Sequence, residues 1–179
     1  MAVGCWLRLS VYQGPGKELV RGMKRGEVHV EYQPLVTSHD GQPYGMEALL
    51  RWTHPTEGPI PPDVFIQYAE SQNLIIPLTR HLFQLVSRDA HQLCHTIPRH
   101  ACLSLNISPL HLADSCFRQD VLRWLDTMPA AHFNYVFEIT ERAMVRDENV
   151  GELFDWLHQQ HINIAIDDFG TGHCALSYL

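Results

Sequence analysis

The chain has 179 residues, of which 45% are hydrophobic, values typical of one folded domain with a sizeable core. Its formal net charge of −7 at pH 7 excludes a general nucleic-acid binder, because such proteins bind phosphate through an excess of Lys and Arg. The five cysteines are scattered and contain no CxxC pair, a pattern that indicates reduced thiols in the cytosol rather than a disulfide framework.

The first predicted segment is an N-terminal tail over residues 1–16, which includes the Gly- and Pro-rich break at 13–16. Its apolar opening is too short to cross a bilayer, and no plausible signal-peptide cleavage site follows. We interpret it either as a loosely docked tail or as the remnant of a juxtamembrane linker whose membrane helix lies upstream of Met1. The rest of the chain is expected to be cytoplasmic, in the second case as the cytoplasmic part of an inner-membrane protein.

From residue 17 onward the hydrophobic pattern predicts strands and helices in alternation. The Asp-Gly turn within Ser38–Gly41 predicts that the first two strands form an antiparallel hairpin. Three further strands are expected, each separated from the next by at least one helix. The expected strands are 28–35, 44–51, 101–107, 135–140 and 162–167, and the expected helices begin near 17, 61, 77, 109, 117 and 147.

The last three strands each have one bulky face and one smaller, more polar face. Along 101–107, for example, Leu103 and Leu105 alternate with Ser104 and Asn106. An open doubly wound sheet, with helices on both faces, would usually show apolar residues on both faces of its strands. The pattern therefore predicts a TIM-type (β/α) barrel, whose polar strand faces line an interior that opens at the carboxyl ends of the strands.

Polar side chains gather on these inward faces and near that mouth. They are Gln33, Glu47, Arg51, Asn106, Glu138 and Asp167, with Asp168 just beyond. Carboxylate and amide oxygens without Cys or His select a hard cation such as Mg²⁺ or Mn²⁺ over Zn²⁺. Two such ions can clamp a phosphodiester and activate water for in-line attack. The alternative is that these acids are unrelated helix caps and surface charges.

Five motifs in this chain resemble those of a known family in order and spacing. They are Tyr32-Gln33-Pro34, Glu47-Ala48-Leu49-Leu50-Arg51-Trp52, Leu105-Asn106-Ile107-Ser108, Glu138-Ile139-Thr140-Glu141 and Asp167-Asp168-Phe169-Gly170-Thr171-Gly172. Over residues 17–179 the chain resembles the EAL family of bacterial cyclic-di-GMP phosphodiesterases. The resemblance implies a TIM-type barrel with an antiparallel first strand, and hydrolysis of cyclic di-GMP to linear pGpG with two Mg²⁺ or Mn²⁺ ions.

The resemblance also implies a role for each motif residue. Glu47, Asn106, Glu138, Asp167 and Asp168 would bind metal, and Gln33 and Arg51 would contact the dinucleotide. Glu141 is expected to brace the Gly170–Gly172 loop without touching metal. Partners implied are cyclic di-GMP and a second copy of the chain, bound through the Asp168–Gly172 loop region, with no nucleic-acid polymer.

The family pattern continues past Leu179 with strands that bear a catalytic Lys and a further metal-binding Glu. Residues 17–179 are therefore expected to form a partial EAL domain with about five of the eight barrel strands. Two functions follow: a cyclic-di-GMP phosphodiesterase, or a truncated, non-catalytic remnant that binds cyclic di-GMP or another protein. We expect the chain alone to be inactive, because the metal pair lacks ligands, and to be poorly soluble or oligomeric, because the last strand has an unpaired edge.

Overall fold

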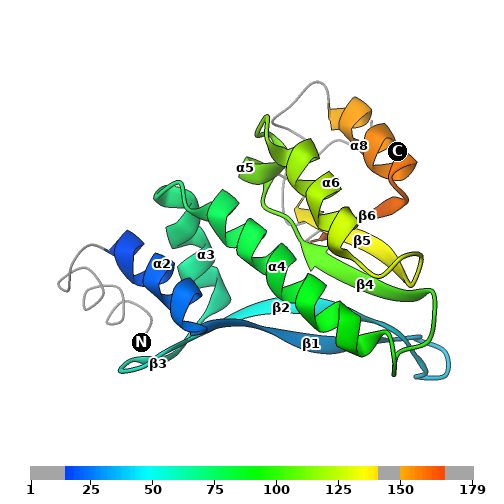
Figure 1. The fold of residues 1–179 in the computed structure, drawn as a ribbon, viewed down its shortest axis with the longest axis horizontal. Helices are drawn as coiled ribbons and strands as arrows, with labels where there is room; N and C mark the ends of the chain where they lie inside the picture. The colour runs from blue at the N-terminus through cyan, green and yellow to red at the C-terminus, as the bar shows by residue number, and fades with distance from the viewer. Residues whose placement is uncertain (1–14, 141–149, 168–179) are drawn as a thin grey trace. The chain divides into compact units, whose positions relative to one another are not determined.

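The computed structural model describes residues 15–140 and 150–167 (Figure 1). These residues belong to two compact units. The first unit contains residues 15–31 and 49–86, and the second contains 32–48, 87–140 and 150–167. Residues 1–14 of the expected tail, the expected helix start at 147, Glu141, Asp168 and the Asp168–Gly172 loop lie outside the described residues.

The described elements alternate largely as the sequence predicts (Figure 1). In chain order they are α2 (Pro15–Arg25), β1 (Val28–Val36), β2 (Pro43–His54), β3 (Gly58–Ile60), α3 (Pro62–Ser71), α4 (Ile75–Leu93), β4 (Ala101–Asn106), α5 (Pro109–Leu112), α6 (Phe117–Thr127), β5 (Phe133–Thr140), α8 (Val150–Gln159) and β6 (Ile162–Asp167). Within the described ranges, no helix has both the length and the apolar character needed to cross a membrane.

The strands form one mixed sheet in the order β1-β2-β4-β5-β6, with the short β3 paired to β2. From β2 to β6 the neighbours in this order are parallel. Residues 37–42 join β1 to β2, and a connection this short can only link antiparallel strands. Among the described residues β1 and β6 are the ends of the order, so over these residues the sheet is not closed. The predicted TIM-type architecture with an antiparallel first strand, incomplete here, is confirmed.

The core of the first unit forms where α2, α3 and the start of α4 cover the strands of that unit. Trp52 in β2 is 2% exposed, and its ring meets the ring of Phe65 from α3 edge to face at a centroid distance of 6.1 Å. The α2 side contributes Leu19, which is fully buried. A Cβ added at Gly22 in α2 would lie 2.9 Å from Trp52 Nε1, so the glycine lets the helix approach the indole.

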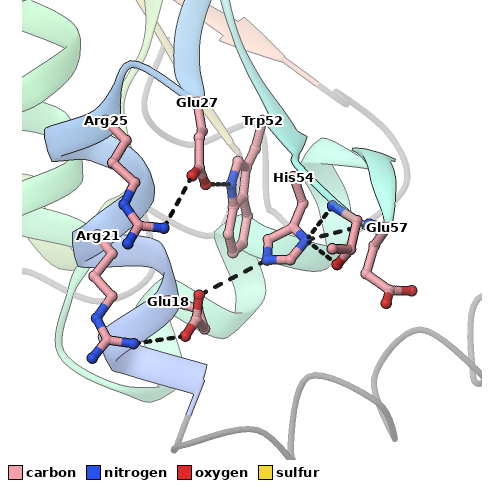
Figure 2. Close-up of polar contacts among 8 residues, drawn as sticks. Glu18, Arg21, Arg25, Glu27, Trp52, His54 and Glu57 are labelled. Carbon is pink, nitrogen blue, oxygen red and sulfur yellow. Dashed lines mark hydrogen bonds and ion pairs between the residues drawn. The ribbon is translucent and has the colours of Figure 1, made fainter.

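A polar network fixes the turn that leads out of β2 (Figure 2). The backbone N–H groups of Thr56 and Glu57 donate to His54 Nδ1 over 3.4 and 3.3 Å. On the other side of the ring, Nε2 lies 3.8 Å from Glu18 Oε2, and Arg21 pairs with the same glutamate at 3.1 Å. Because Nδ1 accepts, the proton of the neutral imidazole sits on Nε2, towards Glu18. The turn positions β3, a three-residue strand that the sequence analysis missed.

The core of the second unit lies between its helices and the bulky faces of β4 and β5. Phe137 of β5 is fully buried, and its ring lies 5.8 Å from that of Trp124 and 6.3 Å from that of Phe117, both on α6. On β4, Leu103 and Leu105 are at most 1% exposed. The smaller faces of the same strands point away from this core. The predicted division of a strand into a packed face and a more polar face is therefore confirmed for β5, where buried positions alternate with more accessible ones.

Candidate functional site

Parallel strands of the second unit bring the predicted polar residues into one row across the sheet. Glu47 in β2 is in register with Ser104 in β4, and Asn106, two residues further along β4, is in register with Glu138 in β5. In β6, position Asp167 is in register with residue 140, two positions after Glu138. Register partners share a face of the sheet, and alternate residues return to that face. We call Glu47, Ser104, Asn106 and Glu138 the polar row.

A hydrogen bond joins the first two strands of the polar row. Asn106 Nδ2 donates to Glu47 Oε1 at 2.7 Å, a length typical of a bond to a charged acceptor. Asn106 is exposed and Glu47 half-buried, so both side chains are accessible to a ligand. With its amide nitrogen turned towards Glu47, Asn106 keeps Oδ1 as an oxygen donor for another partner.

A second hydrogen bond, from Ser104, orients the carboxylate of Glu138. The Ser104 hydroxyl donates to Glu138 Oε1 in a short hydrogen bond, and the serine is only 1% exposed. Cys102 lies two residues before Ser104, and therefore on the same face of β4. Burial, and next the charge of Glu138, raise the pKa of the Cys102 thiol, so this thiol stays protonated at neutral pH.

The two residues expected to contact the dinucleotide lie on β1 and β2. Gln33 in β1 is exposed, and its neighbour Tyr32 donates its hydroxyl to Asp89 Oδ2 at 3.1 Å. Burial, followed by the charge of Asp89, raises the pKa of Tyr32. Within the first unit, Arg51 of β2 is half-buried and its Nε donates to Glu31 Oε2 at 2.9 Å.

The donor set of the polar row fits a divalent cation. Glu47 and Glu138 supply carboxylates and Asn106 an amide oxygen, the ligands that Mg²⁺ and Mn²⁺ prefer. Each carboxylate is oriented by a hydrogen bond from β4, as metal-binding carboxylates commonly are. The side chain of Asp167 and the whole of Asp168 and Glu141 lie outside what the structure describes. Their roles, like the metal-binding roles of the other three residues, stay predictions.

Sequence reasoning did not single out Ser104 as a site residue. One signal was available, because Ser104 stands two positions before Asn106 and therefore shares its face of the strand. What could not be read from the sequence is the register of β4 against β5, which sets Ser104 within reach of Glu138.

The comparison with protein families decides the identity of the domain. The model of the EAL domain matches residues 17–179. The chain belongs to the EAL domain family. The resemblance found in the five sequence motifs is thereby confirmed.

Curated EAL relatives are closely similar over nearly the whole chain. The chain is 47% identical over 175 residues to the probable cyclic di-GMP phosphodiesterase PdeN of Escherichia coli K12. This match covers 98% of the chain and 34% of PdeN. The chain is also 34% identical over 148 residues to the cyclic di-GMP phosphodiesterase PdeL of the same organism, covering 82% of this chain and 41% of PdeL. The chain thus spans between a third and a half of the length of these two relatives.

Solved EAL structures share the fold. The PaMucR phosphodiesterase in complex with c-di-GMP matches with a TM-score of 0.77 and 29% identity, over 89% of this chain and 65% of that one. The EAL enzyme Bd1971 in its cGMP-bound form matches with a TM-score of 0.77 and 24% identity, over 90% of this chain and 46% of that one. Because the identity to Bd1971 is only 24%, this second similarity is evidence for the fold alone.

Proposed function

We propose that the EAL domain to which this chain belongs hydrolyses cyclic di-GMP to linear pGpG at the polar row. The observation that carries the proposal is the bond from Asn106 Nδ2 to Glu47 Oε1, at 2.7 Å, with Glu138 in register beside it. Residues from three separate family motifs thus meet on one face of the sheet. The names of the curated relatives PdeN and PdeL and the PaMucR complex with c-di-GMP support the same substrate.

In this proposal two Mg²⁺ or Mn²⁺ ions are held by the acids and the amide of the family motifs. The proposed ligands are Glu47, Asn106, Glu138, Asp167 and Asp168. Bound there, such ions neutralise phosphate charge and lower the pKa of the attacking water. The chain's own contribution is orientation, because Asn106 fixes the Glu47 carboxylate and Ser104 fixes that of Glu138 before any ligand arrives.

Substrate contacts are proposed for Gln33 and Arg51. Gln33 is exposed, and its amide can both donate to and accept from a nucleotide. Arg51 already donates to Glu31, and this pair is accessible to solvent. Binding a phosphate would therefore exchange one anionic partner of the guanidinium for another, at a modest energetic cost. Glu141 is proposed to brace the Gly170–Gly172 loop.

The proposal extends to partners and location. A homodimer would form through the Asp168–Gly172 loop region, as the family resemblance implies. The net charge of −7 supports a small dinucleotide as the ligand, in place of a nucleic-acid polymer. Scattered cysteines support a cytoplasmic location for the domain.

The test replaces Glu47 by Gln, a change that keeps the acceptor oxygen for Asn106 and removes only the charge. The matched control is Glu152→Ala, at an exposed glutamate on α8. Both variants are made in the 179-residue chain and in the same chain extended by the segment with which the family pattern continues. Hydrolysis is followed as pGpG by chromatography with Mn²⁺, and cyclic-di-GMP binding is followed by calorimetry.

We expect turnover in the extended wild type and in Glu152→Ala, and a loss of at least 100-fold in Glu47→Gln, because one metal ligand loses its charge. Full turnover by Glu47→Gln would overturn the assignment of the polar row. Tight cyclic-di-GMP binding without any hydrolysis by the extended protein would identify a binding module instead. Steady turnover by the 179-residue chain alone would show that these residues suffice for catalysis.

A further inference from the structure

A second cluster of potential metal ligands lies on the helical side of the second unit, away from the polar face of β4. His111 comes from α5, Cys116 immediately precedes α6, and Asp120 lies in the first turn of α6. One ligand atom from each of the three residues lies within 4.8 Å of the other two. His111 Nε2 and Asp120 Oδ2 are the closest pair, at 3.1 Å. No family motif and none of the proposed catalytic roles involves these residues.

Local structure explains how three residues from two helices meet. Cys116 immediately precedes α6, and Asp120 is four residues later, so both side chains lie on one side of the first turn. The tight loop between the helices brings His111 against them, with its ring edge to face with that of Phe117 at 5.1 Å. The partial positive charge at the start of α6 favours anionic side chains at these positions.

The burial of the cluster is what makes it unusual. His111 is fully buried and Asp120 is 5% exposed, although ionisable side chains are rarely so enclosed. Taking a carboxylate out of water is costly unless a cation or a strong hydrogen bond offsets its charge. Cys116 is only half-buried, so the cluster lies near the protein surface on that side.

We propose that His111, Cys116 and Asp120 bind a single Zn²⁺ ion that ties α5 to α6. One imidazole nitrogen, one thiolate and one carboxylate form a donor set that Zn²⁺ favours, whereas a thiolate disfavours Mg²⁺. Around a tetrahedral zinc, ligand atoms lie about 3.3–3.8 Å apart, as bond lengths of about 2.0–2.3 Å require. Atoms already within 4.8 Å of one another reach that arrangement by side-chain adjustments of about an ångström.

A fourth ligand position remains for water or for Asp114. Asp114 lies beside Cys116, since its Oδ1 accepts a hydrogen bond from the Cys116 backbone N–H at 2.9 Å. Binding exchanges the thiol proton of Cys116 for the ion, the proton leaves to solvent, and no electron is transferred. The site is structural in this proposal and is independent of cyclic-di-GMP hydrolysis.

Co²⁺ serves as the probe, because a Co²⁺–thiolate bond gives a near-ultraviolet charge-transfer band that oxygen ligands at the polar row cannot give. The 179-residue chain is titrated with Co²⁺ under reducing conditions, and the band is then displaced with Zn²⁺. One variant is Cys116→Ser, which keeps a hydroxyl donor for the neighbouring carboxylates. The matched variant keeps Cys116 and replaces Cys5, Cys94, Cys102 and Cys174 by Ser.

We expect the band in the wild type and in the matched variant, its loss in Cys116→Ser, and a Zn²⁺-dependent rise in melting temperature that Cys116→Ser lacks. Asp120→Asn is expected to weaken Zn²⁺ binding at least 10-fold. A band that persists in Cys116→Ser, or its absence from the wild type and the matched variant alike, would overturn the proposal. The cluster would then be a buried hydrogen-bonded group without metal.

Discussion

Gly45 offers the sharpest test of how β2 and β4 hold the polar row. It is in register with Cys102, and a Cβ built on Gly45 would lie 2.5 Å from the Cys102 carbonyl oxygen and 2.9 Å from its Cα. Both are backbone atoms, which cannot turn aside as the end of a flexible side chain can. Gly45→Ala must therefore push the two strands apart at this point. Glu47, two residues further along β2, would move away from Asn106.

The expected loss of stability follows from these contacts. Overpacking a core costs typically about 1–3 kcal/mol, and a clash with rigid backbone belongs at or above the upper end. Replacing glycine also restricts the unfolded chain, which stabilises the folded protein by about 0.4–1 kcal/mol and offsets part of the cost of the clash. We therefore expect Gly45→Ala to lower the free energy of unfolding by about 2 kcal/mol or more.

Gly151 in α8 is the matched control, because a Cβ there would meet nothing within 4 Å. Gly151→Ala should raise the free energy of unfolding by up to about 1 kcal/mol, the helix preference of alanine over glycine. Urea denaturation measures both variants, with the slope of the transition as a check that the unfolded state is unchanged. If Gly45→Ala unfolds within about 0.5 kcal/mol of the wild type, the close approach of β2 to β4 inferred here is wrong.

Three further predictions concern single side chains. Ser104→Ala should weaken Mn²⁺ binding about 10-fold or more, because Glu138 loses the hydroxyl that orients its carboxylate. Calorimetry measures the affinity, and an unchanged value would contradict this role of Ser104. The Ser108 hydroxyl caps the start of α5, because it accepts from the backbone N–H of Leu110 at 3.2 Å. Ser108→Ala should therefore lower the free energy of unfolding by about 0.5–2 kcal/mol, and Ser108→Gly by only a few tenths of a kcal/mol. Equal losses in the two variants would argue against this helix cap. Burial, and next hydrogen bonds to two neighbouring aspartates, raise the pKa of the Cys116 thiol from about 9 to about 11. The rate at which Cys116 is alkylated in metal-free protein, measured by mass spectrometry, should therefore increase until about pH 11. Because this pKa is raised in the folded state, the associated stability is complete below about pH 9 and is lost as pH rises through about 11; a rate that levels off near pH 9 would refute the shift.

The periodicity of apolar residues was enough to predict most of the fold. The helix expected to begin near 61 is found as α3, Pro62–Ser71, and the helix expected to begin near 109 is found as α5, Pro109–Leu112. These predictions hold because they depend on local rules: proline fits the first turn of a helix, and a serine hydroxyl accepts from a free N–H at its start. The same rule explains one inaccuracy. The helix predicted from residue 17 begins at Pro15, because that proline starts the helix instead of interrupting it.

What the sequence could not predict depends on which strands and helices meet. The three-residue β3 is too short to show a period, and it pairs with the end of β2, beyond a turn held by His54. Likewise, Ser104 and Glu138 are distant in sequence, and their contact exists only because β4 and β5 pair in one particular register. The buried cluster around His111 depends on the packing of α5 against α6, which no single helix pattern contains.

The two candidate metal sites differ in chemistry because they lie on opposite sides of the same strand-to-helix connection. On the polar face of β4, Ser104 and Asn106 orient carboxylates that stay accessible, which suits hard ions that must exchange ligands with a substrate. After β4, the backbone N–H of Ile107 donates to the carbonyl of Glu138 at 2.9 Å, which fixes the point where the chain leaves the sheet for α5. There the chain enters the helical layer, where His111 is enclosed and Cys116 offers a sulfur ligand, conditions that favour a permanently bound, softer ion. Removing the metal from one site should therefore leave the ligand set of the other intact.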